Sequence, residues 1–338
     1  MKFIQYSEHG SDYDEILQLV TSPDDDATSK TPPPGFATVK IVAASGNPID
    51  FKVAQGGLKE AWDCPLPMTM GYDFSGEIFA VSDGESNLKV GDEVFAVNWG
   101  QNQHKPAEGP LGGAFAEYIT IPVATLSKKP TGVTHQQAAA VALVGTTAYE
   151  CLFDCMNIKE GDKVLILGGP TAVGSLAIQL AKNAGAWVAT TASPRNMDYV
   201  KSLGPDLIIN YRESDWSDHP DLIGIDAVFD AVGEDGAFGK ISAEGSKVVK
   251  EGGQFVSIAS FDAGFDPAAH KPRFGFASFF CLYNSAMVQD KLAVELESGK
   301  LKVSLDKTFP FSKEGAVEMM KYIESGKGRG KNVMTIAV

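Results

Sequence analysis

The sequence is poor in the residues that build metal sites and disulfide frameworks. Only four cysteines and five histidines occur in 338 residues. The cysteines follow neither a closely spaced zinc pattern nor the framework of a small secreted domain. We therefore expect reduced thiols in an intracellular protein. Cys151 and Cys155 are four residues apart without further ligands nearby, which favours packing over metal binding.

Long apolar runs and excess basic charge are also missing. No apolar run reaches the roughly 18 residues of a membrane helix, so we expect no membrane span. Lys and Arg number 29 against 43 Asp and Glu, which gives a formal net charge of −14. Phosphate backbones repel so acidic a chain, which argues against nucleic acid as a partner. The chain starts on a strand-like segment without a basic targeting signal, so the cytoplasm is the expected location.

The length and the order of patterns indicate an α/β protein of two domains. Residues 1–127 contain short apolar runs separated by turn clusters, and residues 98–113 form a polar, Gly/Pro-rich stretch that we interpret as a long loop or lid. Thr134 and Gln137 then form a capping-box signature at the start of a helix. Strands and helices alternate from there, which predicts a doubly wound parallel sheet. The expected strands are 164–167, 187–191, 207–210, 225–232 and 254–259.

Residues beyond 285 are predicted to return to the first domain. They are expected to form a helix at 286–297, a strand, a helix at 314–325 and a closing strand at 332–338.

One stretch carries a nucleotide-binding pattern. The apolar run 164–167 reads as a strand buried on both faces, and a glycine turn and a helix follow it. Gly169, Thr171 and Gly174 occupy the three positions of a Gly-x-Gly-x-x-Gly fingerprint, so the middle glycine is missing. The N–H groups at such a helix start face a pyrophosphate, and the Thr171 hydroxyl could replace a close backbone approach there. An ordinary strand-to-helix connection is the alternative.

Several motifs occur in a fixed order along the whole chain and together resemble one family. They are Asn47-Pro48-Ile49-Asp50-Phe51-Lys52, Gly71-Tyr72-Asp73-Phe74-Ser75-Gly76, Val90-Gly91-Asp92-Glu93-Val94, Gly113-Ala114-Phe115-Ala116-Glu117-Tyr118, Thr146-Thr147-Ala148-Tyr149, the glycine turn, Ile209-Asn210-Tyr211 and Gly330-Lys331-Asn332-Val333. The chain resembles the medium-chain dehydrogenase/reductase superfamily, in its zinc-free quinone oxidoreductase and enone (2-alkenal) reductase branch. The resemblance implies a GroES-like β-rich catalytic domain at 1–127, completed by 286–338. It also implies a Rossmann NADP-binding domain at 128–285 and a cleft between the two.

The resemblance also implies that no metal is bound. Asn47 and Tyr72 stand where zinc-dependent members of the family carry Cys and His ligands, and neither side chain is a suitable zinc ligand here. The family's structural zinc needs four closely spaced cysteines, and residues 97–113 contain none.

The expected cofactor is NADP(H). An NAD site places Asp or Glu about 20 residues after the glycine turn, but the first acid after the second strand is Asp198. Ser193 and Arg195 can instead bind a 2′-phosphate, and by resemblance Tyr211 lies beside it.

The resemblance implies hydride transfer from NADPH to a quinone or to the C=C bond of an α,β-unsaturated carbonyl. Asn47, Tyr72 and Lys52 are then the catalytic candidates. Asn47 and Tyr72 donate to the developing enolate, and Lys52 reaches the cofactor. Thr147 is expected near the nicotinamide. The full predicted cofactor set is Lys52, Thr147, Gly169, Thr171, Ala172, Val173, Gly174, Ser193, Arg195, Asn196, Tyr211, Ile258, Phe280, Cys281, Leu282, Arg329 and Gly330.

Two other functions stay open. One is a zinc-free alcohol or aldehyde dehydrogenase-like enzyme of the same fold, and the other is a non-catalytic, crystallin-like or regulatory NADPH-binding protein. The expected partner is a small enone or quinone substrate, with a homodimer possible and with neither nucleic acid nor a membrane.

Overall fold

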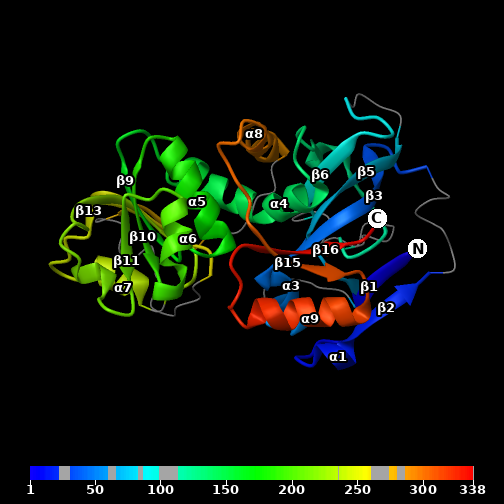
Figure 1. Cartoon of the computed structure of the whole chain (residues 1–338), viewed down its shortest axis with the longest axis horizontal. Coiled ribbons are helices and arrows are strands. Elements are labelled where there is room, and N and C mark those ends of the chain that lie inside the picture. The colour runs from blue at the N-terminus through cyan, green and yellow to red at the C-terminus, as the bar shows by residue number, and fades with distance from the viewer. Residues whose placement is uncertain are drawn as a thin grey trace. The chain divides into compact units, whose positions relative to one another are not determined.

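Figure 1 shows the computed structural model of the chain, which describes residues 1–22, 31–59, 66–82, 87–98, 113–234, 236–259, 274–279 and 286–337. The chain forms two compact units, Met1–Thr146 with Tyr283–Val338, and Thr147–Leu282. The domain boundaries expected at 127/128 and 285/286 stay a prediction, because a compact unit need not be a domain that folds alone.

The first unit is built on two β-sheets. A three-stranded sheet has the order β2-β1-β4, and a larger sheet has the order β15-β16-β3-β5-β6-β8, with β7 also paired to β3. The strands are β1 (Lys2–Tyr6), β2 (Leu17–Thr21), β3 (Phe36–Gly46), β4 (Met68–Thr69), β5 (Asp73–Val81), β6 (Glu93–Val97), β7 (Tyr118–Pro122), β8 (Ser127–Lys128), β15 (Leu305–Pro310) and β16 (Lys331–Thr335). The helices are α1 (Tyr13–Ile16), α3 (Pro48–Ala54), α4 (His135–Tyr149), α8 (Ala286–Glu297) and α9 (Lys313–Glu324).

The closing strand β16 places the end of the chain in the middle of the first unit. It pairs antiparallel with β3, with Asn332 opposite Gly46, and β3 pairs with β5, with Ser45 opposite Asp73. The end of β3 and the beginnings of β5 and β16 therefore share one edge of the sheet. Apolar side chains of these strands and of α9 form one buried core beneath it.

The second unit is a six-stranded parallel sheet of the predicted kind. Its order is β11-β10-β9-β12-β13-β14, in which the first strand along the chain, β9, lies between the second and the fourth. This is the order of a dinucleotide-binding sheet, and ligands bind where the strand order reverses, at the carboxyl ends of β9 and β12. The strands are β9 (Lys163–Leu167), β10 (Trp187–Ala192), β11 (Leu207–Asn210), β12 (Ile225–Asp230), β13 (Val249–Ser257) and β14 (Phe274–Phe279), and the helices are α5 (Ala172–Asn183), α6 (Met197–Ser202) and α7 (Ala237–Ser242).

The capping box predicted at residue 134 is confirmed. The N–H of Thr134 donates to Gln137 Oε1 at 3.0 Å, and the N–H of Gln137 donates to Thr134 Oγ1 at 3.2 Å. The strand β14 was not expected from the sequence, nor was the π-helix Glu150–Cys155 that continues α4. No local pattern marks the π-helix, because it differs from an α-helix only in its hydrogen bonds.

Among the described residues, one helical stretch, His135–Cys155, is long and apolar enough by composition to cross a membrane. About 72% of its most apolar segment is buried inside the protein. A helix in the core of a folded domain can be equally long and apolar.

Candidate functional site

The turn between β9 and α5 can be made only by glycine at three positions. Gly168 has a φ of +85°, which side chains rarely adopt. A Cβ on Gly169 would lie 2.4 Å from Thr190 Oγ1, and one on Gly174 would lie 2.2 Å from the carbonyl oxygen of Gly168. The backbone is therefore packed too tightly for side chains, as in a turn that a phosphate approaches closely.

Thr171, in the middle position of the fingerprint, caps the helix. Its hydroxyl donates to the carbonyl of Gly168 at 2.8 Å and accepts the N–H of Gly174 at 3.0 Å. Its φ of −67° and ψ of 161° are those of an ordinary N-cap. The hydroxyl is therefore committed to the turn itself, which explains why a threonine can stand where the fingerprint has glycine.

The first two N–H groups of α5 remain for a ligand. Those of Ala172 and Val173 have no hydrogen-bond partner among the described residues, as expected for the first turn of a helix. They lie at the positive end of the helix, next to the glycine turn. This combination fits the pyrophosphate of a dinucleotide.

Strand β10 fixes this turn through two threonines that the sequence reasoning missed. Thr191 accepts the N–H of Gly168 on its Oγ1 at 3.0 Å and the N–H of Gly169 on its carbonyl at 3.1 Å. Thr190 Oγ1 donates to the carbonyl of Ile166 at 2.7 Å. Hydroxyl groups at the end of an otherwise apolar buried strand were the signal that could have found them.

The carboxyl end of β10 lacks an acid and meets the end of β11. Ala192 lies opposite Asn210 in the parallel register, so Ser193 and Tyr211 each follow a paired residue at the same edge. Ser193 is buried and Tyr211 is 49% exposed. Both fit a 2′-phosphate and adenine better than the two hydroxyls of an NAD ribose, which an acid would bind.

Asn196 and Arg195 complete this corner. The Oδ1 of Asn196 is buried and has no hydrogen-bond partner in the described part of the chain, so a ribose hydroxyl there would satisfy it. Arg195 is exposed in the short helix Pro194–Asn196. An exposed guanidinium beside a buried serine is suited to pairing with a phosphate.

The end of β12 lies across the switch point from the glycine turn. Asp230 Oδ1 accepts the N–H groups of Val232, Gly233 and Glu234 at 2.9–3.2 Å, and its Oδ2 accepts the hydroxyl of Ser257 at 2.9 Å. Its backbone carbonyl accepts the N–H of Ile258, which is half-buried at the end of β13. Three further residues of the predicted cofactor set, Phe280, Cys281 and Leu282, lie outside the described residues.

Asn47, in the first unit, lies inside a buried polar network. It is 1% exposed and precedes α3. Its Nδ2 donates to Asp73 Oδ2 at 2.9 Å and to the carbonyl of Ser45 at 3.4 Å, and its Oδ1 accepts from Lys331 Nζ. Donation from Asn47 to a substrate oxygen therefore requires one of these bonds to open.

Asp50, Asp73 and Lys331 supply the charges of this network. Lys331 Nζ donates to Asp73 Oδ2 at 3.0 Å, and both side chains are buried, at 4% and 0% exposure. Burial raises the pKa of Asp50 to about 7, and repulsion from Asp73 adds to it. Burial also raises the pKa of Asp73, and the ammonium of Lys331 opposes that shift. Two acids thus share one buried cation. Asp73 and Lys331 both belong to the family motifs given above, but the sequence did not show that they pair. A charged residue at the start of an otherwise apolar strand was the pattern that could have indicated it.

Tyr72 and Lys52 flank this network along the chain. Tyr72 is 2% exposed, and its carbonyl accepts the N–H of Asn98 at 2.7 Å. Lys52 is half-buried on α3, and its ammonium has no partner among the described residues. The Lys52 ammonium is therefore available to bind an anionic group of a ligand.

Two neighbouring threonines at the end of α4 differ in whether their hydroxyl is already hydrogen-bonded. Thr146 Oγ1 donates to the carbonyl of Ala142 at 2.6 Å, a bond within the helix. Thr147 is 6% exposed, and its hydroxyl has no partner among the described residues. Of the two, Thr147 is the one free to contact a cofactor.

Arg329 and Gly330 precede β16. The N–H of Arg329 donates to Asp306 Oδ2 at 3.0 Å, and its side chain is exposed. A Cβ on Gly330, whose φ is +94°, would lie 2.3 Å from the carbonyl oxygen of Ser304. Gly330 is thus required by a close backbone approach within the first unit.

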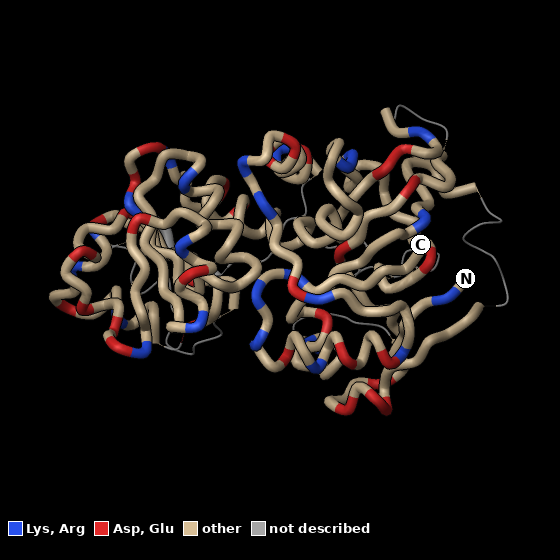
Figure 2. Tube along the Cα trace, viewed as in Figure 1, with Lys and Arg blue, Asp and Glu red and all other residues tan. Residues whose placement is uncertain are grey.

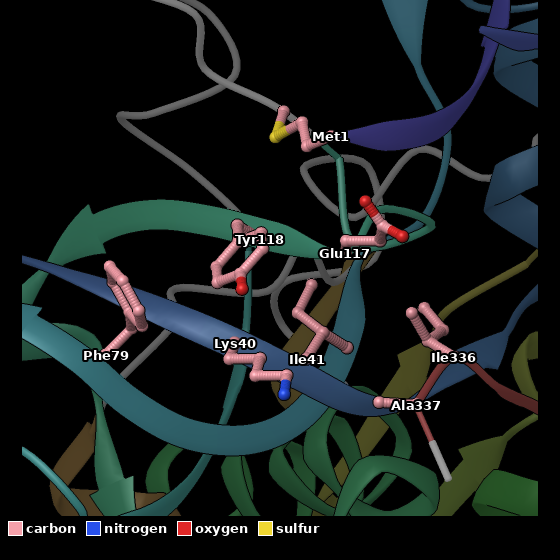
Figure 3. Close-up of a pocket in the computed structure, with 8 residues that line it drawn as sticks. All are labelled: Met1, Lys40, Ile41, Phe79, Glu117, Tyr118, Ile336 and Ala337. Atoms are coloured by element: carbon pink, nitrogen blue, oxygen red, sulfur yellow. The ribbon is translucent and has the colours of Figure 1, made fainter. Parts of the chain in front are cut away.

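Within the described part of the chain, no group of three or more His, Cys, Asp or Glu side chains is placed to hold a metal. A surface hollow of about 490 Å³ is lined by Lys40, Phe79 and Tyr118 among others (Figure 3), and none of the predicted site residues lines it. Acidic and basic residues are interspersed along both units (Figure 2).

Two family models match the sequence. The alcohol dehydrogenase GroES-like domain matches residues 33–131, and the zinc-binding dehydrogenase model matches residues 203–334. With the dinucleotide-binding sheet and the GroES-like unit, these matches place the chain in the medium-chain dehydrogenase/reductase superfamily.

Within that superfamily the chain belongs to the quinone oxidoreductase and enone (2-alkenal) reductase branch. It is 38% identical over 299 residues to the 2-methylene-furan-3-one reductase of Solanum lycopersicum, covering 88% of this chain and 70% of that protein. It is 36% identical over 299 residues to the chloroplastic NADPH-dependent alkenal/one oxidoreductase of Arabidopsis thaliana, covering 88% and 71%. The structure of the quinone oxidoreductase from Coxiella burnetii superposes with a TM-score of 0.81 at 32% identity, covering 99% of both chains.

Proposed function

We propose that this protein is an NADPH-dependent oxidoreductase that reduces quinones or the C=C bond of α,β-unsaturated carbonyls. The observation that supports this cofactor is the pair of N–H groups at Ala172 and Val173, which have no partner among the described residues and lie at the start of α5, while the end of β10 lacks an acid. The substrate class is supported by the relatives, whose names describe a furanone reductase, an alkenal/one oxidoreductase and a quinone oxidoreductase.

The residues of the second unit would hold the cofactor by its phosphates. Ala172 and Val173 would bind the pyrophosphate, and Ser193 and Arg195 would bind the 2′-phosphate. Thr147 and Ile258 would border the nicotinamide. NADPH supplies the hydride, so the protein's own task is alignment and electrostatics.

The residues of the first unit would stabilise the charge that develops on the substrate oxygen. Addition of hydride to the β-carbon of an enone leaves the electron pair of the broken C=C bond on the enolate, which then takes a proton at the α-carbon. Tyr72 and Asn47 are the proposed hydrogen-bond donors, and Lys52 is the proposed cofactor ligand. We propose that this occurs without zinc, because Asn47 and Tyr72 replace the Cys and His of zinc-dependent relatives.

The decisive experiment is an assay of NADPH oxidation with a panel of 2-alkenals, cyclic enones and quinones, in which the products are identified by mass spectrometry. We expect turnover with enones or quinones and an efficiency with NADH at least about tenfold lower. Oxidation of alcohols with NAD⁺ would favour the dehydrogenase-like alternative. Tight NADPH binding without turnover on the whole panel would favour the non-catalytic alternative.

We further propose a homodimer located in the cytoplasm. Met287 and Val294, 67% and 65% exposed, lie seven residues apart on α8 and hence on one face, which suits an interface between copies. Cys151 and Cys155 are unpaired, which suits a reducing compartment. Light scattering of the purified chain and imaging of the tagged chain test the two proposals.

A further inference from the structure

Strand β5 holds α4 at two points on one face. Asp73 and Ser75 are two residues apart in the strand, so both side chains point the same way. Asp73 Oδ1 accepts the N–H of Leu143 at 2.8 Å, and the Ser75 hydroxyl contacts His135 Nδ1 at 2.8 Å. The first contact is unusual, because an N–H inside a helix ordinarily pairs with the carbonyl four residues before it.

The second oxygen of Asp73 holds a different part of the molecule. Asp73 Oδ2 accepts from Asn47 Nδ2 at 2.9 Å and from Lys331 Nζ at 3.0 Å. Lys331 Nζ also donates to Asn47 Oδ1 and to the carbonyl of Gly46 at 2.9 Å, so its three hydrogens are all used. Both ends of the Asn47 amide are thereby fixed by one ion pair.

A single carboxylate thus links two segments that carry candidate site residues. Through one oxygen it sets the amide of Asn47, and through the other it holds α4 four residues before Thr147. Asp73 itself is 0% exposed, and both of its carboxylate oxygens accept hydrogen bonds from the protein. Its charge is compensated by Lys331, which comes from the other end of the chain.

We propose that Asp73 is a positioning residue for the reduction, with Lys331 as its counter-ion: it fixes Asn47 and the Leu143 turn of α4 relative to each other. The inference rests on the proposed function. A rigid link of this kind matters because a displacement of about 1 Å between aligned groups can cost a hundredfold in rate.

The test compares Asp73→Asn, the double variant Asp73→Asn/Lys331→Met, and Ser75→Ala. Asn cannot satisfy both sides, because one of its two terminal atoms is a donor facing other donors. The double variant removes the buried ammonium that the single variant leaves unpaired, so it keeps the test valid if the single variant folds poorly. Ser75→Ala is the matched control, because it loosens α4 on the same strand face without touching Asn47.

We expect kcat with the best acceptor to fall at least about tenfold in both Asp73 variants, while the Kd for NADPH, measured by fluorescence titration, changes less than about threefold. The double variant should regain melting temperature over Asp73→Asn without regaining kcat. Ser75→Ala should lose melting temperature and keep kcat within about threefold of the wild type. A kcat that recovers together with the melting temperature in the double variant would overturn the proposal, as would an unchanged kcat in Asp73→Asn.

Hydrogen–deuterium exchange separates this proposal from the proposed function. In both Asp73 variants, peptides around Asn47 and around Leu143 should exchange faster together, whereas Ser75→Ala should affect only the start of α4. Faster exchange in one segment alone would show that Asp73 does not link them. A wild-type chain without turnover on any acceptor would refute the proposed function. The exchange experiment would still show whether Asp73 links the two segments.

Discussion

Asp50 Oδ2 accepts the backbone N–H of Asn47 at 2.7 Å, whereas Asp50 Oδ1 is buried and has no hydrogen-bond partner among the described residues. A protonated carboxyl group suits this environment, because a buried charge with few hydrogen bonds costs more than a buried neutral group. Burial raises the pKa of Asp50 to about 7 in accordance with this geometry.

The first prediction concerns the pH dependence of stability. Because the pKa of Asp50 is higher in the folded chain than in the unfolded chain, its contribution to stability is full below about pH 4 and is lost as the pH rises towards 7. Asp50→Asn mimics the protonated acid and does not titrate. The free energy of unfolding of the wild type minus that of Asp50→Asn should therefore fall between about pH 4 and 7, by at most about 4 kcal/mol.

Urea unfolding of both proteins from pH 4 to 8 measures this difference. Asp198→Asn, on the exposed start of α6, is the control and should run parallel to the wild type. Parallel profiles for Asp50→Asn as well would show that Asp50 is ionised in the folded chain throughout this range.

The second prediction separates capping from phosphate binding at Thr171. Thr171→Ala removes the bonds to Gly168 and Gly174 and should lower the free energy of unfolding by about 1 kcal/mol. The Kd for NADPH should change less than about threefold, because Ala172 and Val173 keep their N–H groups. Ser312→Ala, which removes the equivalent cap of α9, is the matched control. A tenfold weaker NADPH affinity confined to Thr171→Ala would mean that the hydroxyl contacts the phosphate.

The third prediction concerns cofactor preference. Ser193→Asp places an acid at the end of β10, where it repels a 2′-phosphate and can accept from a ribose hydroxyl. The ratio of kcat/KM for NADPH to that for NADH should fall by at least about tenfold. Ser202→Asp adds the same charge on the exposed end of α6 and should leave the ratio unchanged. Equal ratios in both variants would remove Ser193 from the cofactor site.

The fourth prediction concerns Lys52, whose ammonium has no partner among the described residues. Lys52→Ala should raise the KM for NADPH by about five- to tenfold and the KM for the enone by less, because the loss falls on cofactor binding. Lys59→Ala, an exposed lysine seven residues further on, is the control. If both substitutions leave the NADPH KM unchanged, Lys52 does not reach the cofactor.

The fifth prediction concerns the Tyr72 hydroxyl. If it donates to the enolate oxygen, Tyr72→Phe should lower kcat by about 10- to 100-fold and alter the KM for NADPH little. Tyr118→Phe, at the surface hollow of the same unit, should keep full activity. Full activity of Tyr72→Phe would show that the hydroxyl does not stabilise the enolate.

Local patterns in the sequence determined several helices and strands of this protein and indicated its family and cofactor. The strand Leu207–Asn210 and the helix Ala286–Glu297 have the bounds that the sequence predicted, because periodicity and turn residues act over a few positions. The motif order indicated the family, and the missing acid after β10 indicated NADP(H), since both are properties of the chain read in order.

Tertiary structure alone decided which polar groups meet. Asn47, Asp73 and Lys331 are joined only because β3, β5 and β16 pair at one edge of a sheet, and the register of that pairing depends on side chains from the whole unit. The sequence showed a threonine in place of a glycine at residue 171, but only the folded turn showed that its hydroxyl closes the turn on itself. Contacts between distant segments follow from packing, which no local pattern encodes.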